Sequence, residues 1–181
     1  MNTALNASAL QQKPPSASSV PPNKIWIKMI NSEDFTPIIK TMLREGVAKS
    51  EARARDLCVA FCQWFAVRII AQGKPFLMFK GQVDETFHCF VLNTEFYAAF
   101  CKKYSDSFIH HSPLDSEGAA KFIKLGGATN TTNLLTQHFS EALHPELKKW
   151  VSLNKKGKLT EATVSCGPLN PLCWSDDSVN T

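Results

Sequence analysis

The 181-residue sequence contains no run of about 18 consecutive apolar residues, which excludes a membrane-spanning helix. It has only eight glycines and ten prolines and no internal repeat, which excludes collagen-like and glycine-rich repeat proteins. It also lacks the Walker phosphate-binding loop, the glycine pattern of a dinucleotide-binding fold, the nucleophile elbow and the HExxH zinc motif. We therefore expect no nucleotide cofactor, and no catalytic residue is assigned from a motif.

An excess of charge of one sign is also missing, because 20 Lys and Arg face 16 Asp and Glu for a net charge of +4. Nucleic-acid-binding proteins usually carry a denser basic stripe. The densest basic group here consists of Lys148, Lys149, Lys155, Lys156 and Lys158. A short charge run of this kind is typical of a solvated helix end and loop. Neither nucleic acid nor a membrane is an expected partner.

The six cysteines could form a disulfide framework in a secreted protein. Residues 1–10, however, lack the basic start and the apolar core of a signal peptide. Cys58 and Cys62 lie one helical turn apart in an apolar segment, where cysteine behaves as a small hydrophobic residue. The spacing of Cys166 and Cys173 is too long for a zinc knuckle, and a bridge or a redox-sensitive pair between these two stays open. We predict free thiols and a cytoplasmic location.

Composition divides the chain into three parts. Residues 1–23 are rich in Ser, Ala, Asn, Gln and Pro and cannot bury enough apolar surface to offset chain entropy, which predicts a disordered leader. Residues 24–153 show helical periodicity, and residues 154–181 form an irregular tail. No convincing strand pattern is present. The fold class is therefore predicted to be all-α, a compact bundle of about five helices.

Five segments carry the helical signals. The expected helices cover residues 37–45, 51–72, 83–104, 116–125 and 132–150. The second is the clearest, because Ser50 can cap its start, Gly73 ends it and a rich apolar stripe places it in the middle of the core. Pro145 either kinks the fifth helix or divides it in two. His138 and His144 are expected near a helix surface.

The remaining three histidines and one carboxylate form the candidate site. Asp84 and His88 are four residues apart, so their side chains stack on one face of the third helix. An imidazole beside a carboxylate is a good ligand for zinc or ferrous iron, and His110 or His111 could supply a second imidazole. Neighbouring residues in an extended loop point to opposite sides, so we expect only one of the two to join His88. The candidate metal ligands are Asp84, His88, His110 and His111.

Two other interpretations of this cluster stay open. Asp84 could orient His88 as a general base without any metal. Alternatively, the two side chains could simply form a hydrogen bond that ties the helix to the loop. A di-iron site is set aside, because its Glu-x-x-His motif must occur twice and here occurs once, at Glu85 and His88.

Residues 83–113 carry a series of short motifs in order. These are VDETFH at 83–88, VLNTEFYAAFC at 91–101 and FIHHSP at 108–113. The series resembles the glycine-rich domain-containing protein-like family, small bacterial proteins related to a module of plant glycine-rich domain proteins. Phe87 stands where that family has tryptophan, and the glycine-rich tail of many relatives is missing. The resemblance implies a compact helical module in which the four candidate ligands belong together.

Three hypotheses about function follow. The leading one is a cytoplasmic helical module whose Asp/His site binds a divalent metal, with Zn²⁺ first and Fe²⁺ second. The second is a module that binds a protein partner of unknown identity, in which the Asp/His cluster is only structural. The third is an enzyme that uses His88 as a base or as an iron ligand, and it requires a pocket beside His88.

Overall fold

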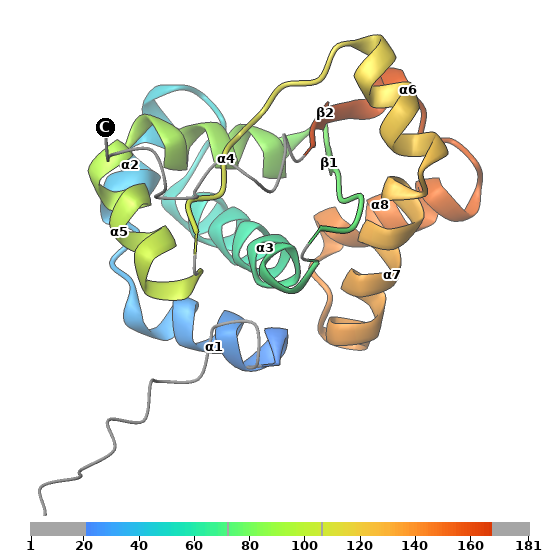
Figure 1. The fold of residues 1–181 in the computed structure, drawn as a ribbon. Coiled ribbons are helices and arrows are strands. Elements are labelled where there is room, and N and C mark those ends of the chain that lie inside the picture. Colours follow the sequence, from blue (N-terminus) through green and yellow to red (C-terminus); the bar gives the residue numbers. More distant parts are fainter. Residues whose placement is uncertain (1–20, 72, 106, 168–181) are drawn as a thin grey trace, which may run out of the picture.

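The computed structural model describes residues 21–71, 73–105 and 107–167, and within these ranges the chain forms eight α-helices and one two-stranded sheet (Figure 1). The helices are α1 (Pro22–Ser32), α2 (Thr36–Arg44), α3 (Glu51–Ile70), α4 (Gln82–Leu92), α5 (Thr94–Tyr104), α6 (Ser116–Lys124), α7 (Gly127–Phe139) and α8 (Pro145–Lys155). The strands are β1 (Met78–Phe79) and β2 (Val164–Cys166), and two 3₁₀ turns cover Ser140–Ala142 and Glu161–Thr163. The all-α class is confirmed, but the expected number of helices was too low.

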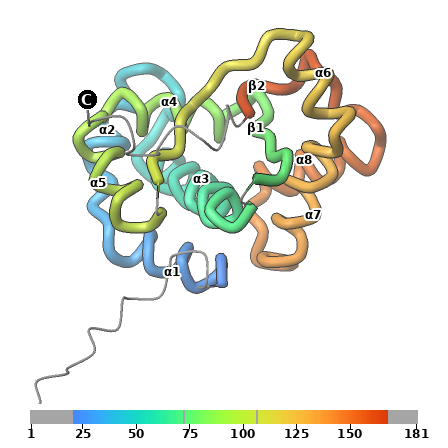
Figure 2. The backbone as a smooth tube through the Cα atoms, in the orientation of Figure 1, coloured from blue at the N-terminus to red at the C-terminus, as the bar shows by residue number. Residues whose placement is uncertain are grey.

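Helix α3 is the centre of the structure. In Figures 1 and 2 it lies between α2, α4 and α5 on one side and α6, α7 and α8 on the other. Ser50 caps it as predicted, because its hydroxyl accepts a hydrogen bond from the backbone N–H of Arg53. Its aromatic side chains pack closely against α4, with the ring centroids of Phe61 and Phe90 only 4.1 Å apart. The core therefore forms around α3, and α4 is fixed against it.

The predicted continuous helix over residues 83–104 is wrong, because the chain breaks at Asn93 into α4 and α5. Asn93 has a ψ of 64°, and its side-chain amide donates hydrogen bonds to the Cys89 carbonyl and the Thr41 hydroxyl. A side chain that bonds to nearby backbone in this way competes with helix continuation. The site-bearing helix is therefore the short α4.

The segment predicted as the fifth helix contains two helices, α7 and α8. Pro145 occupies the first turn of α8, so it divides the segment rather than kinking it. Helix α7 begins at Gly127, earlier than expected, because Gly126 takes a left-handed conformation with a φ of 83° that ends α6. Helix α1 had no predicted counterpart. Of the predicted leader at residues 1–23, residues 1–20 lie outside the described residues, and α1 already begins at Pro22. Of the predicted tail at residues 154–181, the part beyond residue 167 lies outside them, and the described part contains β2.

The two short strands connect distant parts of the chain. Strand β1 pairs antiparallel with β2, with Met78 opposite Cys166 and Phe79 opposite Val164. On its other side, Cys166 forms an isolated bridge with Pro113, in the loop between α5 and α6. Strands of two and three residues are too short to show an alternating pattern, which explains why the sequence predicted none. Strand β2 thus attaches the α5–α6 loop to the body of the protein.

None of the helices within the described ranges combines the length and the apolar character that a membrane span requires.

Candidate metal centre

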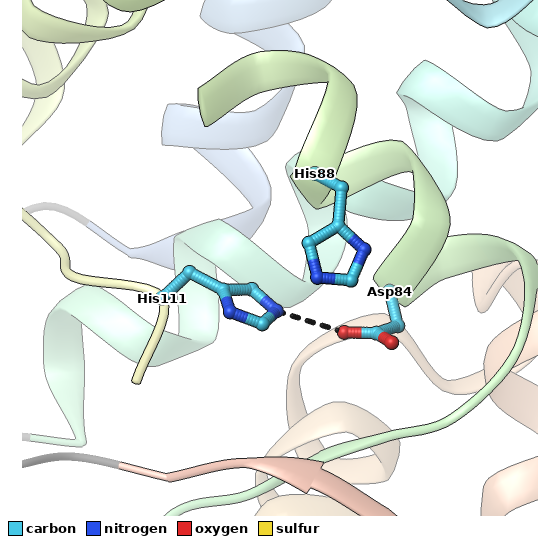
Figure 3. A group of neighbouring side chains, drawn as sticks. All are labelled: Asp84, His88 and His111. Carbon is cyan, nitrogen blue, oxygen red and sulfur yellow. Dashed lines mark hydrogen bonds and ion pairs between the residues drawn. The ribbon is translucent and has the colours of Figure 1, made fainter. Parts of the chain in front are cut away.

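Three side chains from two parts of the fold converge on one point. Asp84 and His88 belong to α4, and His111 belongs to the α5–α6 loop (Figure 3). One ligand atom from each side chain lies within 4.8 Å of the other two. His111 Nε2 is 3.0 Å from Asp84 Oδ1, and the ring centroids of His88 and His111 are 4.3 Å apart.

The start of α4 determines where Asp84 and His88 lie. The helix begins directly after Gly81, whose φ of 135° turns the chain, and Asp84 stands in the first turn, where a negative charge is favourable. Val83 and Phe87 anchor the adjacent face of the helix in the core. Asp84 is buried, whereas the His88 side chain is 46% exposed. The pair therefore lies at the edge of the core, with its open side at His88.

The α5–α6 loop brings in His111 and turns His110 away. The His111 side chain is only 6% exposed, and its ring packs edge-on against Phe87. His110 is exposed, and its ring packs on Phe108 instead. This alternation is expected for adjacent residues of an extended segment. The Tyr97 hydroxyl, which donates a hydrogen bond to the carbonyl of the residue before His110, holds the loop in place.

Two further side chains contact the group. The Ser165 hydroxyl, from β2, donates a hydrogen bond of 2.7 Å to Asp84 Oδ1. Glu85 Oε2 lies 3.8 Å from His88 Nδ1 on the exposed side of α4. The sequence analysis did not identify Ser165, since it lies far along the chain in a segment predicted to be an irregular tail. No local pattern could have revealed it.

The donor set fits a transition-metal ion. One carboxylate and two imidazoles form the ligand set of several zinc enzymes and of the non-haem ferrous iron sites. In the structure as described, Asp84 Oδ1 accepts hydrogen bonds from both His111 and Ser165. His111 Nε2 can therefore act either as a hydrogen-bond donor or as a metal ligand. It can donate its proton to Asp84, or it can give its lone pair to a metal after losing that proton.

A second histidine–carboxylate pair, formed by His144 and Asp56, lies away from the candidate site and connects α8 to α3. His144 is buried rather than near a surface as predicted, and its Nε2 lies 2.9 Å from Asp56 Oδ1. Its Nδ1 accepts the backbone N–H of Glu146 and so caps α8. Burial opposes ionisation of Asp56, but His144 and Arg53 outweigh it and lower the pKa of this carboxyl. This pair locks α8 onto α3.

The fold and site define a helical protein with a candidate carboxylate–bis-imidazole metal centre. The chain belongs to the UCP032817-like family, whose sequence model matches residues 26–121. Comparisons with curated proteins and with solved structures found no match. The matched range contains Asp84, His88 and His111 but ends before Ser165.

The family match corrects the resemblance to the glycine-rich domain-containing protein-like family, which was wrong. Several residues that carried the resemblance, such as Tyr97 and Phe100, are fully buried in the core. Aromatic residues at helical spacing arise wherever two helices pack together, so they do not identify a family. The function is therefore argued from the site itself.

Proposed function

We propose that the protein binds one divalent metal ion through Asp84, His88 and His111, with Zn²⁺ as the first choice and Fe²⁺ as the second. The observation that carries the proposal is the convergence of the three ligand atoms within 4.8 Å of one another. Zinc bonds of about 2.1 Å in a tetrahedral site place the ligand atoms about 3.4 Å apart. The 3.0 Å between His111 Nε2 and Asp84 Oδ1 is already close to that spacing.

The surroundings of His88 favour one of its nitrogens as the ligand. Metal-binding histidines usually turn their other ring N–H toward a carboxylate or carbonyl. Glu85 Oε2 is on the Nδ1 side of the His88 ring, at 3.8 Å. It favours the tautomer with the proton on Nδ1, which leaves the Nε2 lone pair for the metal. The exposed side of His88 also gives the ion a route from solvent.

Three protein ligands would leave a fourth position for water, the arrangement found in catalytic zinc sites. The proposed location remains the cytoplasm. It is supported by the five described cysteines, which are buried and form no disulfide with one another.

One observation favours the alternative, a protein-interaction module with a purely structural cluster. Asp84 Oδ1 already accepts two hydrogen bonds, from His111 and Ser165, so the buried carboxylate is satisfied without an ion. Under this alternative, metal content would be negligible and replacement of His111 would affect only the stability of the fold.

Elemental analysis of untagged protein purified without chelator separates the two functions. We expect close to one equivalent of zinc or iron in the wild type and in His110→Ala, which serves as the matched control. His88→Ala and His111→Ala should lose it. Absence of metal in the wild type, even after reconstitution with Zn²⁺ and anaerobically with Fe²⁺, would overturn the proposal.

A further inference from the structure

We propose that Ser165 is a positioning residue for the metal ligand Asp84, and that strand β2 thereby supports the metal centre from outside the family-matched segment. This inference rests on the proposed metal-binding function. It starts from the 2.7 Å hydrogen bond between Ser165 Oγ and Asp84 Oδ1, which joins residues 81 positions apart in the chain.

The backbone around Ser165 is held from two sides. Its own carbonyl accepts a hydrogen bond from the N–H of Leu114, and the next residue but one, Gly167, donates to the Ser112 carbonyl. Cys166 pairs with Met78 of β1 at the same point. The hydroxyl is therefore carried by a segment that lies between β1 and the loop containing His111. Its position relative to Asp84 is set by backbone pairing, which makes it suitable for orienting another side chain.

Strand β2 contacts both parts of the site. It reaches α4 through the Ser165 side chain and reaches the His111 loop through the backbone bond from Leu114 to Ser165, and Gly167, directly after the strand, adds a backbone bond to Ser112. Asp84 and His111 come from different elements, and β2 is the described segment that bonds to both of those elements beside the site. The relative position of the two ligands therefore depends on β2.

Metal binding would increase the importance of Ser165. When the His111 Nε2 lone pair is given to the metal, that nitrogen no longer donates to Asp84 Oδ1. Among the described residues, the Ser165 hydroxyl is then the donor that remains on Oδ1, and it fixes the rotation of the carboxylate. Loss of such an outer hydrogen bond typically lowers metal affinity by about 10- to 100-fold.

The test is a zinc affinity measured by competition with a chromophoric chelator. We expect Ser165→Ala to weaken zinc binding about 10-fold or more. Ser165→Thr keeps the hydroxyl and should restore most of the affinity. Ser152→Ala, at an exposed position of α8, is the matched control and should bind like the wild type. The visible absorption of the Co²⁺-loaded protein should change in Ser165→Ala alone, and thermal unfolding of the metal-free variants reports separately on folding.

The outcomes distinguish this inference from the proposed function. If the wild type and Ser165→Ala bind zinc equally tightly and share the same Co²⁺ spectrum, the role of Ser165 is overturned while the metal site stands. If Ser165→Thr binds as weakly as Ser165→Ala, the hydroxyl is not the cause and the assignment also fails. If the wild type binds neither Zn²⁺ nor Co²⁺, both proposals are overturned together.

Discussion

His111 Nε2 lies 3.0 Å from Asp84 Oδ1, and each of these two side chains exposes only 6% of its surface. This contact joins the α5–α6 loop to the first turn of α4 at a place shielded from water. His88, one turn further along α4, exposes 46% of its side chain. Members of one candidate ligand set therefore differ in their structural role, and this difference can be measured without metal.

In metal-free protein, His111→Ala should lower the free energy of unfolding by about 1–3 kcal/mol, because it removes a donor from a buried carboxylate and leaves a gap beside Phe87. His88→Ala should change it by about 0.5 kcal/mol or less, as is usual for an exposed side chain. Urea unfolding in the presence of a chelator measures both. Equal losses for the two variants would contradict the burial difference.

The sequence predicted the α4 half of the site because that half is local. Asp84 and His88 are four residues apart, and helical geometry alone places them together. The sequence could not predict which of His110 and His111 faces the site, because this depends on the conformation of a loop that Tyr97 and β2 hold in place. Ser165 was out of reach for the same reason. It meets Asp84 only through long-range strand pairing, which has no local signature.

The fold shows the same division between local and non-local information. The Ser50 cap and the apolar stripe of α3 were sufficient to predict that helix. The break at Asn93 was missed because an Asn inside a helical pattern ends the helix only when its side chain finds partners. One of those partners, Thr41, lies on α2 and is known only from the folded structure.

The hydrogen bond between His144 of α8's N-terminus and Asp56 of α3 predicts that the stability of the fold depends on pH. His144 Nδ1 accepts the Glu146 N–H, so the ring proton is on Nε2 and is donated to Asp56. The pKa of Asp56 is lowered below its ordinary value of 3.8, so its stabilising contribution is present above 3.8 and is lost as the pH falls through the folded-state pKa. Asp56→Asn should destabilise by about 1 kcal/mol at pH 7.

The difference between wild type and Asp56→Asn should therefore shrink as unfolding is repeated from pH 7 down to pH values below 3.8. Glu141→Gln, at an exposed position of the 3₁₀ turn after α7, is the matched control and should follow the wild type at every pH. A difference that stays constant over this range would show that the charge of Asp56 does not contribute.

The described thiols should be unreactive in the native protein. Burial raises the pKa of Cys58 and of Cys166 to about 12 and that of Cys89 to about 11. Burial also raises the pKa of Cys62 and Cys101. Since the thiolate is the reactive form, N-ethylmaleimide at pH 7 should modify these five only after urea is added. Mass spectrometry of the peptides measures this, and rapid native labelling of any of the five would contradict the burial.

Zinc binding should slow amide hydrogen exchange in β2 and in the loop that it contacts. If Ser165 positions Asp84, opening of β2 disturbs a metal ligand, and the coupling must act equally in both directions. A 10-fold effect of Ser165 on zinc affinity therefore implies an opening equilibrium about 10-fold less favourable in the zinc-bound protein, and exchange that is about 10-fold slower where reclosing is faster than exchange. The reporting amides are those of Leu114 and Gly167, which donate to Ser165 and Ser112, together with Lys80, which donates to Thr163.

Ser165→Ala at saturating zinc is the decisive comparison for this effect. The metal still contacts α4 and the His111 loop there, so protection of the α4 amides should persist, while the zinc-dependent protection at Gly167 and Lys80, which report opening of β2, should be reduced. Amides of α7, which carries no candidate ligand, report global stabilisation and should respond equally in both proteins. If β2 in Ser165→Ala is protected by zinc as strongly as in the wild type, the strand is coupled to the metal through the His111 loop backbone, because that is the other described connection between them.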